Sequence, residues 1–240
     1  MRLLLISNST MAGKPYLDFP KHQIKKFLGK KPVTAVLVPY SAVTMSFDEY
    51  CKKVEERFKE IGHHIAGLHT FADPVKAVEE AEAIIIGNGN TWRLARMLHD
   101  QKLMNPIREK VFNGTPYIGW SAGLNIAGPT LRTTNDMPIM DPHGFECVGL
   151  VPFQINTHYT EENIRDHAGE SREQRIEEFI AMNVETYVVG LREGTMLKLE
   201  RGKLKLIGDK TCRIFKKGLD PFELSSKDDL TFLMETGFLA

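Results

Sequence analysis

A serine lies between small residues at the end of an apolar run, in the segment Gly119-Trp120-Ser121-Ala122-Gly123. The pattern G-x-S-x-G is typical of a nucleophilic serine on a sharp turn from a buried strand into a helix. Small neighbours let backbones pass closely, and the first N–H groups of the helix can stabilise an oxyanion. We therefore predict Ser121 as the nucleophile of an acyl transfer and the Ala122 N–H as one oxyanion donor. A tight turn without chemistry is the alternative interpretation.

A second turn rich in glycine follows another apolar run, in Gly87-Asn88-Gly89-Asn90-Thr91. It has neither the lysine of a P-loop nor the third glycine of a dinucleotide-binding fingerprint. Adjacent parallel strands bring the loops at their carboxyl ends together. The Gly89 N–H is therefore the predicted second oxyanion donor.

A serine nucleophile needs a base, and the chain has eight histidines. Most lie in polar or helical stretches, as is typical of solvated surface histidines. His158 differs because it lies at the end of a strand-like run, residues 153–159, that leads into a polar loop. This setting makes His158 the candidate base.

Short apolar runs predict the strands that must position these residues. They lie at residues 3–6, 34–38, 83–86, 117–120 and 186–189. Their continuous hydrophobicity is what a parallel sheet covered on both faces requires. Residues 195–199, 203–207 and 212–216 alternate instead, which predicts an antiparallel meander at the sheet edge.

Helix signals lie between the strands. Ser46 is a predicted N-cap for residues 47–61, and Asn90 or Thr91 for a helix that runs to residue 98. Ser171, with Gln174 three residues on, predicts a third helix to residue 181. Alternating strands and helices predict right-handed crossovers and an α/β three-layer sandwich with a mostly parallel sheet.

Composition bounds the function. The 240 residues include 31 basic and 31 acidic side chains. The chain therefore has no excess of positive charge of the kind that would predict binding to nucleic acid or to an anionic membrane surface. The three cysteines form no C-x-x-C pair, which argues against a metal or disulfide framework and for a reduced, cytoplasmic protein. The first apolar run is too short for a signal peptide or a membrane span. No linker or repeat divides the chain, so we expect a single domain over residues 1–240, with a homodimer as one compatible assembly.

Several blocks, in order and nearly end to end, resemble peptidase E, the α-aspartyl dipeptidase family of serine peptidases. They are LLISNST at residues 4–10, DEY at 48–50, GNT at 89–91, GWSAGLN at 119–125, RTTNDMPI at 132–139, QINTH at 154–158, REQRI at 172–176 and GLREG at 190–194. The resemblance implies hydrolysis of dipeptides and short peptides with an N-terminal aspartate, without a metal or organic cofactor. It also implies a fold related to class I glutamine amidotransferases.

The resemblance also implies roles for site residues. Ser121 would be the nucleophile and His158 the general base. Glu193 is the favoured carboxylate to orient the histidine, and Asp136 is the alternative, an essential residue of open role. Asn88 departs from the family's usual Gly-Gly-Gly-Asn-Thr turn, and asparagine tolerates a positive φ better than other residues with a side chain.

Recognition of an aspartate side chain needs a cation, preferably a guanidinium that binds a carboxylate through two hydrogen bonds. Arg172 and Arg175 lie three positions apart on one predicted helix and can share a face, and Arg132 lies close to Asp136 in the chain. The resemblance favours Arg172, with Arg175 and Asn90 as further substrate-binding candidates. The polar segment 160–170 is the candidate lid that would restrict substrate size.

Three other classes fit parts of the sequence. An esterase with the α/β-hydrolase fold would share the serine motif, but only 37 positions separate Ser121 from His158, with at most one weak strand between them. A cyanophycinase-like relative would cleave a polymeric aspartyl-arginine substrate in an open groove. A non-catalytic binding domain would keep the fold alone, and the intact set of Ser121, His158 and Glu193 argues against it.

Overall fold

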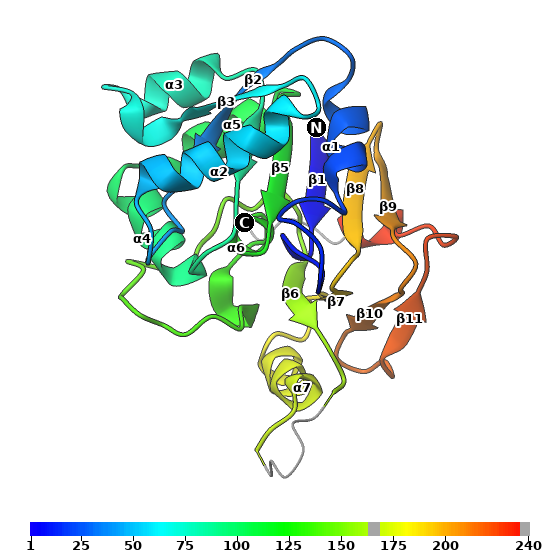
Figure 1. Ribbon diagram of the computed structural model, residues 1–240. Coiled ribbons are helices and arrows are strands. Elements are labelled where there is room, and N and C mark those ends of the chain that lie inside the picture. Colours follow the sequence, from blue (N-terminus) through cyan, green and yellow to red (C-terminus); the bar gives the residue numbers. More distant parts are fainter. Residues whose placement is uncertain (163–168, 236–240) are drawn as a thin grey trace.

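The computed structural model describes residues 1–162 and 169–235, in which two β-sheets lie one below the other (Figure 1). The larger sheet has the order β3-β2-β4-β5-β1-β8-β9, and the smaller has the order β11-β10-β7-β6. The strands are β1 (Arg2–Ile6), β2 (Thr34–Val38), β3 (His64–Gly67), β4 (Ile84–Ile86), β5 (Pro116–Trp120), β6 (Gln154–Tyr159), β7 (Val188–Arg192), β8 (Met196–Glu200), β9 (Lys203–Ile207), β10 (Cys212–Phe215) and β11 (Phe222–Leu224). Strands β1 to β5 pair in parallel, whereas β8 and β9 extend this sheet in antiparallel pairing.

Seven helices flank the sheets within the described residues. They are α1 (Lys21–Leu28), α2 (Phe47–Lys59), α3 (Pro74–Glu80), α4 (Thr91–Asp100), α5 (Met104–Phe112), α6 (Ala122–Asn125) and α7 (Arg172–Met182), with 3-10 turns at Leu68–Thr70, Leu131–Thr133 and Thr231–Met234. The predicted capping boxes at Ser46 and Ser171 are confirmed. For α4 the cap is Asn90, whose side chain accepts from the Arg93 N–H. None of these helices has the length and hydrophobicity that a membrane-spanning segment needs.

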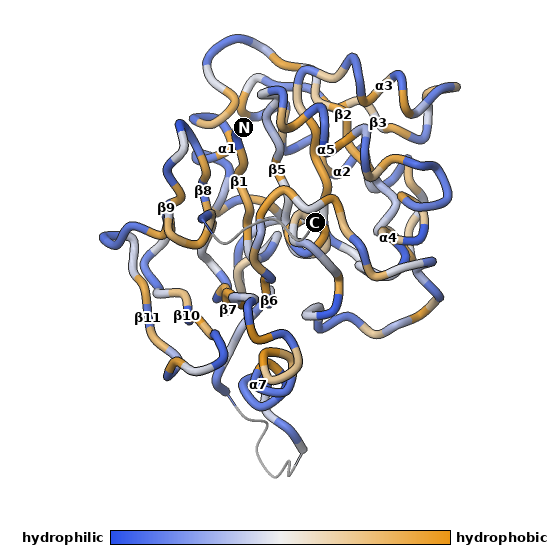
Figure 2. The backbone as a smooth tube through the Cα atoms, turned by 180° about the vertical axis from the view of Figure 1, so that it is seen from behind, coloured by the Kyte–Doolittle hydropathy of each residue, from blue (hydrophilic) through white to orange (hydrophobic). Residues whose placement is uncertain are grey.

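The central strands are buried on both faces, as their unbroken hydrophobicity predicts. In β1, Leu3 and Leu5 belong to the cluster that includes residues of α3, α4, α5 and α6, whereas Leu4 and Ile6 belong to the cluster with α1 and α2. All four side chains are fully buried. The hydrophobic stretches follow these strands through the middle of the molecule, and the hydrophilic ones lie on the outer loops (Figure 2).

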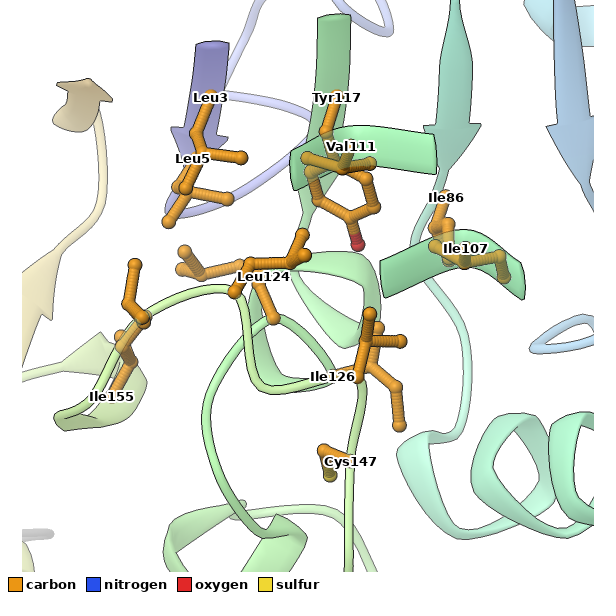
Figure 3. Packing of buried hydrophobic residues seen from close by; sticks show 14 of the residues in the cluster. Leu3, Leu5, Ile86, Ile107, Val111, Tyr117, Leu124, Ile126, Cys147 and Ile155 are labelled. Carbon is orange, nitrogen blue, oxygen red and sulfur yellow. The ribbon is translucent and has the colours of Figure 1, made fainter. Parts of the chain in front are cut away.

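One of these core layers fixes the position of the short helix α6. Leu124 lies between Leu5 of β1 on one side and Ile126 and Ile155 on the other (Figure 3). The buried Tyr117 hydroxyl donates to the Gly123 carbonyl at 2.6 Å. Helix α6 therefore begins at a defined point beyond the carboxyl end of β5.

The predicted fold class is confirmed, because a mainly parallel sheet lies between helical layers. Two strands, however, pair differently from the prediction. The strand expected at residues 186–189 is β7, which pairs with β6 in the second sheet. Of the expected meander, β8 and β9 extend the large sheet, but β10 pairs with β7. Hydrophobic pattern predicts that a segment is a strand but does not specify its partner.

The second sheet has its own hydrophobic layer under α7. Ile176 and Ile180 of α7 pack in a cluster with Tyr159, Val188 and Phe215 of the sheet. Figure 1 shows this sheet and α7 below the ends of β1 and β5. The chain thus carries a second layered unit next to the edge of the large sheet where Ser121 lies.

Candidate active site

Ser121 lies in the turn between β5 and α6, at the carboxyl edge of the large sheet. Its backbone has φ 53° and ψ −110°, a conformation that costs of order 1–3 kcal/mol for a residue with a side chain. The turn is tight enough that a Cβ on Gly123 would lie 1.9 Å from the carbonyl oxygen of Ile86. The Ser121 N–H donates to the Ile6 carbonyl at 3.2 Å. This is the strained strand-to-helix turn that G-x-S-x-G predicts.

Ser121, His158 and Glu193 form a chain of hydrogen bonds. Ser121 Oγ lies 3.0 Å from His158 Nε2, and His158 Nδ1 lies 2.7 Å from Glu193 Oε1. An ionised carboxylate can only accept, so Nδ1 carries the proton and Nε2 is free to accept from the serine hydroxyl. The His158 and Glu193 side chains are 35% and 48% exposed, which leaves the site open to a ligand.

The second sheet brings the histidine and the glutamate together. Strands β6 and β7 are parallel, and their register shifts between Thr157 and Tyr159. His158 lies at this irregularity with φ 54°, so the bulge re-aims its side chain away from the regular alternation of the strand. Glu193 follows the last residue of β7 directly. Both serine and histidine therefore have strained backbones, as residues of functional sites commonly do.

The turn after β4 approaches the serine turn, because β4 and β5 are neighbours. Gly89 has φ 145°, and a Cβ there would lie 2.1 Å from the Ser41 carbonyl oxygen, which accepts from the Asn90 N–H at 2.9 Å. Within residues 1–162 and 169–235, neither the Gly89 N–H nor the Ala122 N–H donates to a protein acceptor. The two predicted oxyanion donors are thus unpaired at adjacent strand ends.

Asn88 has a role that the sequence did not reveal. It does not have a positive φ, so the tolerance expected of asparagine is not used. Its side-chain Oδ1 instead accepts from the Tyr16 hydroxyl at 2.8 Å, the Trp120 indole N–H at 3.0 Å and the Tyr50 hydroxyl at 3.2 Å. Burial raises the pKa of both tyrosines and keeps them as donors. Asn88 thereby ties the glycine turn to the residue before Ser121.

Asp136 does not orient the histidine, which corrects the alternative raised from the sequence. Its Oδ2 accepts from the Thr91 N–H at 2.7 Å and the Thr91 hydroxyl at 2.5 Å, and its main-chain oxygen accepts from the Trp92 indole at 3.0 Å. The carboxylate on His158 Nδ1 is Glu193. Asp136 instead contacts the N-terminus of α4 at Thr91, the residue that follows Gly89 and Asn90.

Asn90, a predicted substrate-binding residue, is engaged within the chain. Its Oδ1 accepts from the Arg93 N–H at 3.0 Å, and its Nδ2 donates to the Met137 carbonyl at 2.9 Å. Its side chain therefore holds the segment around Met137 against the glycine turn, and contact of Asn90 with substrate stays a prediction.

A pocket of about 360 Å³ lies between this segment, β6 and α7. The residues that line it are Arg132, Thr133, Thr134, Asn135, Asp136, Met137, Pro138, Asn156, Arg172, Arg175, Ile176 and Phe179. The three arginines singled out from the sequence are therefore brought together. Asn135 Nδ2 donates to the Thr157 carbonyl at 2.8 Å, so one wall is fixed to the strand that carries His158.

Arg172 is the half-buried member of the three arginines. Its Nη1 donates to the Thr157 carbonyl at 3.2 Å and to the His158 carbonyl. Burial lowers the pKa of Arg172, and the neighbouring Arg175 lowers it further, while Glu193 opposes the shift. A guanidinium remains charged under such shifts. Arg172 also borders a second pocket, of about 630 Å³, beside His158 and Glu193.

An ion-pair network, not foreseen from the sequence, anchors the end of β7 next to Glu193. Arg192 Nη1 and Nη2 lie 2.7 and 2.9 Å from the two oxygens of Glu223, and Nη2 also contacts Glu161. Burial raises the pKa of Glu223, but hydrogen bonds from Arg192, Thr211 and Arg213 outweigh it and lower the pKa to about 2. The pairing involves residues far apart in the chain, and no local motif marks it.

The sequence also led us to expect a lid over residues 160–170 and a site without a metal ion. Residues 163–168 of the candidate lid 160–170 lie outside the described residues. In the part of the chain that is described, no group of three or more histidine, cysteine, aspartate and glutamate side chains is placed to hold a metal ion.

A serine on a strained turn, in line with a histidine and a carboxylate, defines a serine hydrolase, here on a mainly parallel α/β sheet. Comparison of the sequence with models of known protein families identifies the family within that class. Residues 3–207 match the model of Peptidase family S51, so the chain belongs to this family and is a peptidase, as the sequence blocks predicted.

Known proteins agree with this assignment. A relative named Peptidase E from Nostoc sp. is 48% identical over 234 residues, which are 98% of this chain and 97% of the relative. Another Peptidase E, from Salmonella paratyphi A, is 43% identical over 226 residues, 94% of this chain and 98% of the relative.

Two solved structures share the fold. A peptidase from an acI-B1 Actinobacterium has a TM-score of 0.65 at 16% identity and covers 95% of this chain and 96% of its own. A putative Peptidase E protein from Listeria monocytogenes EGD-e has a TM-score of 0.61 at 18% identity, with 87% and 98% covered. At these identities the two structures support the fold alone.

Proposed function

We propose that this peptidase hydrolyses dipeptides and short peptides with an N-terminal aspartate through an acyl-enzyme on Ser121. The observation that carries the proposal is the hydrogen-bonded chain of Ser121, His158 and Glu193 beside a pocket with three arginines. The relatives named Peptidase E support the same function.

In the acylation step, His158 Nε2 takes the proton from Ser121 Oγ as the oxygen attacks the peptide carbonyl carbon. The N–H groups of Gly89 and Ala122 stabilise the negative charge that forms on the carbonyl oxygen. Each contributes about 3 kcal/mol in the transition state. His158 then gives the proton to the leaving nitrogen as the C–N bond breaks.

Deacylation repeats the sequence with water as the nucleophile. His158 takes a proton from the water, whose oxygen attacks the ester carbon, and returns it to Ser121 Oγ as aspartate leaves. Glu193 keeps the Nδ1 proton in place throughout and stabilises the imidazolium that forms twice in each cycle.

Selectivity for aspartate is assigned to Arg172. Its Nη1 is held by the main-chain oxygens of Thr157 and His158, which fixes the plane of the guanidinium beside the catalytic strand. In the described chain its Nε and Nη2 donate to no acceptor, and these two atoms form one edge that can bind a carboxylate through two hydrogen bonds. Arg175 is less available, because its Nε lies 3.6 Å from the Glu170 carboxylate.

The test compares hydrolysis of Asp-Leu and Asn-Leu by the wild type, Arg172→Met and Arg132→Met. The wild type is expected to prefer Asp-Leu by roughly 30- to 1000-fold, the effect of a close charge pair removed from water. Arg172→Met should bring the ratio close to one, whereas Arg132→Met, at an exposed position, should keep most of it. An unchanged ratio in Arg172→Met would refute the assignment, and a wild type inactive on Asp-Leu would refute the proposed function.

A further inference from the structure

A dipeptide that begins with aspartate brings two carboxylates and one ammonium group to the site. The arginines of the pocket suit the carboxylates. They also repel the ammonium group, which is attached to the carbon next to the scissile carbonyl. An anion close to the oxyanion donors would offset this repulsion.

The pocket lined by Arg132, Arg172 and Arg175 is called the arginine pocket below. Asp136 is the one carboxylate among the described residues that line it. Its two oxygens are used differently. Oδ2 is held by the N–H and hydroxyl of Thr91, at 2.7 and 2.5 Å. Within residues 1–162 and 169–235, Oδ1 accepts no hydrogen bond, and the carboxylate pairs with no cation. One oxygen is thus fixed by the protein, and the other is open in a half-buried position.

The position of Asp136 is coupled to both oxyanion donors. Thr91 is the first residue of α4 and comes two residues after Gly89. Asn125, on α6, donates to the Thr91 hydroxyl and to the Thr134 hydroxyl, at 3.0 Å in each case. Helix α6 begins at Ala122. The carboxylate is therefore held at a set place relative to the two N–H groups that would bind the scissile carbonyl oxygen.

We infer that Asp136, through Oδ1, binds the α-ammonium group of the substrate. The inference rests on the proposed function and adds a residue that recognises the free N-terminus of the substrate. It also accounts for a carboxylate among three guanidinium groups without an ion pair to any of them. Asp136 is a binding residue in this account, because it touches the substrate and takes no part in proton transfer.

The experiment compares Asp-Leu with succinyl-Leu, which has the same skeleton and side-chain carboxylate but hydrogen in place of the ammonium group. The variants are Asp136→Asn, which keeps an acceptor for Thr91, and Glu177→Gln as a control of equal charge change. Glu177 is exposed on α7 and does not line the pocket. Each protein is assayed for kcat and KM on both substrates.

The wild type is expected to favour Asp-Leu over succinyl-Leu by roughly 30- to 1000-fold in kcat/KM, as for one buried charged hydrogen bond. Asp136→Asn should lose a similar factor on Asp-Leu, mainly as a higher KM, because ground state and transition state hold the ammonium group alike. Its rate on succinyl-Leu should stay within about threefold of the wild type, as should both rates of Glu177→Gln.

Equal losses of Asp136→Asn on both substrates, or no loss on Asp-Leu, would overturn the inference. Asp136→Ser, which also offers Thr91 an acceptor, replaces the asparagine variant if that protein does not fold, and carries the same expectation. A wild type that hydrolyses Asp-Leu, together with an Asp136→Asn variant that keeps the wild-type ratio of the two substrates, would refute only this role. A wild type that does not hydrolyse Asp-Leu would refute the proposed function itself.

Discussion

Replacing Glu193 by glutamine removes one charge from the triad and little else. The His158 Nδ1 to Glu193 Oε1 distance of 2.7 Å places the imidazolium and carboxylate charges about 4 Å apart. At that separation their attraction is about 4 kcal/mol at an effective dielectric constant of 20 and about 2 kcal/mol at 40. The Glu193 side chain is 48% exposed, so both values are relevant. They correspond to a loss in kcat of roughly 30- to 1000-fold.

The assay is steady-state hydrolysis of Asp-Leu by the wild type, Glu193→Gln and Glu185→Gln, with urea unfolding of each protein. Glu185 is 87% exposed and serves as the matched control, expected to keep its kcat within about twofold. Glu193→Gln should unfold at nearly the wild-type urea concentration, because an exposed pair contributes little to stability. A loss in kcat below threefold in Glu193→Gln would refute Glu193 as the group that orients His158.

Three further changes probe the scaffold around the site. Gly123→Ala places a Cβ 1.9 Å from the Ile86 carbonyl oxygen, so kcat on Asp-Leu should fall at least about 100-fold while the protein loses about 2–4 kcal/mol in urea unfolding. Asn88→Ala removes the acceptor of the Tyr16 and Tyr50 hydroxyls and the nearer of two acceptors of the buried Trp120 indole, and should lower the free energy of unfolding by about 1–3 kcal/mol; an unchanged value would contradict its bridging role. Glu223, whose pKa is lowered to about 2 and whose side chain is 35% exposed, should stabilise the fold by about 1 kcal/mol above pH 4.5. Its stability difference from Glu223→Gln should shrink as the pH falls toward 2, and a difference independent of pH would count against it.

The parts of the site that the sequence predicts are those encoded locally. Ser121 and the two oxyanion donors follow from glycines placed at the ends of apolar runs, because a strained turn needs small residues in its own segment. His158 follows from its place at the end of a strand-like run. Glu193 required the resemblance to a family, since a carboxylate after a strand is common and carries no signal of its own.

The parts that the sequence does not predict depend on pairing between distant segments. The bulge that re-aims His158 is a register shift between β6 and β7, and neither strand specifies it alone. The three donors on Asn88 come from Tyr16, Tyr50 and Trp120, which lie far from it in the chain. The sequence does not predict the second sheet for the same reason. The pattern of β10 is that of a third meander strand, and only its pairing with β7 places it in the second sheet.

The most direct test of the account is mass spectrometry of the protein after reaction with a fluorophosphonate. A serine activated by His158 is expected to form one covalent adduct, located on Ser121, with loss of Asp-Leu hydrolysis in proportion to the labelled fraction. Full labelling of Ser121 with activity intact, or loss of activity with the adduct on another residue, would contradict the assignment of Ser121 as the nucleophile.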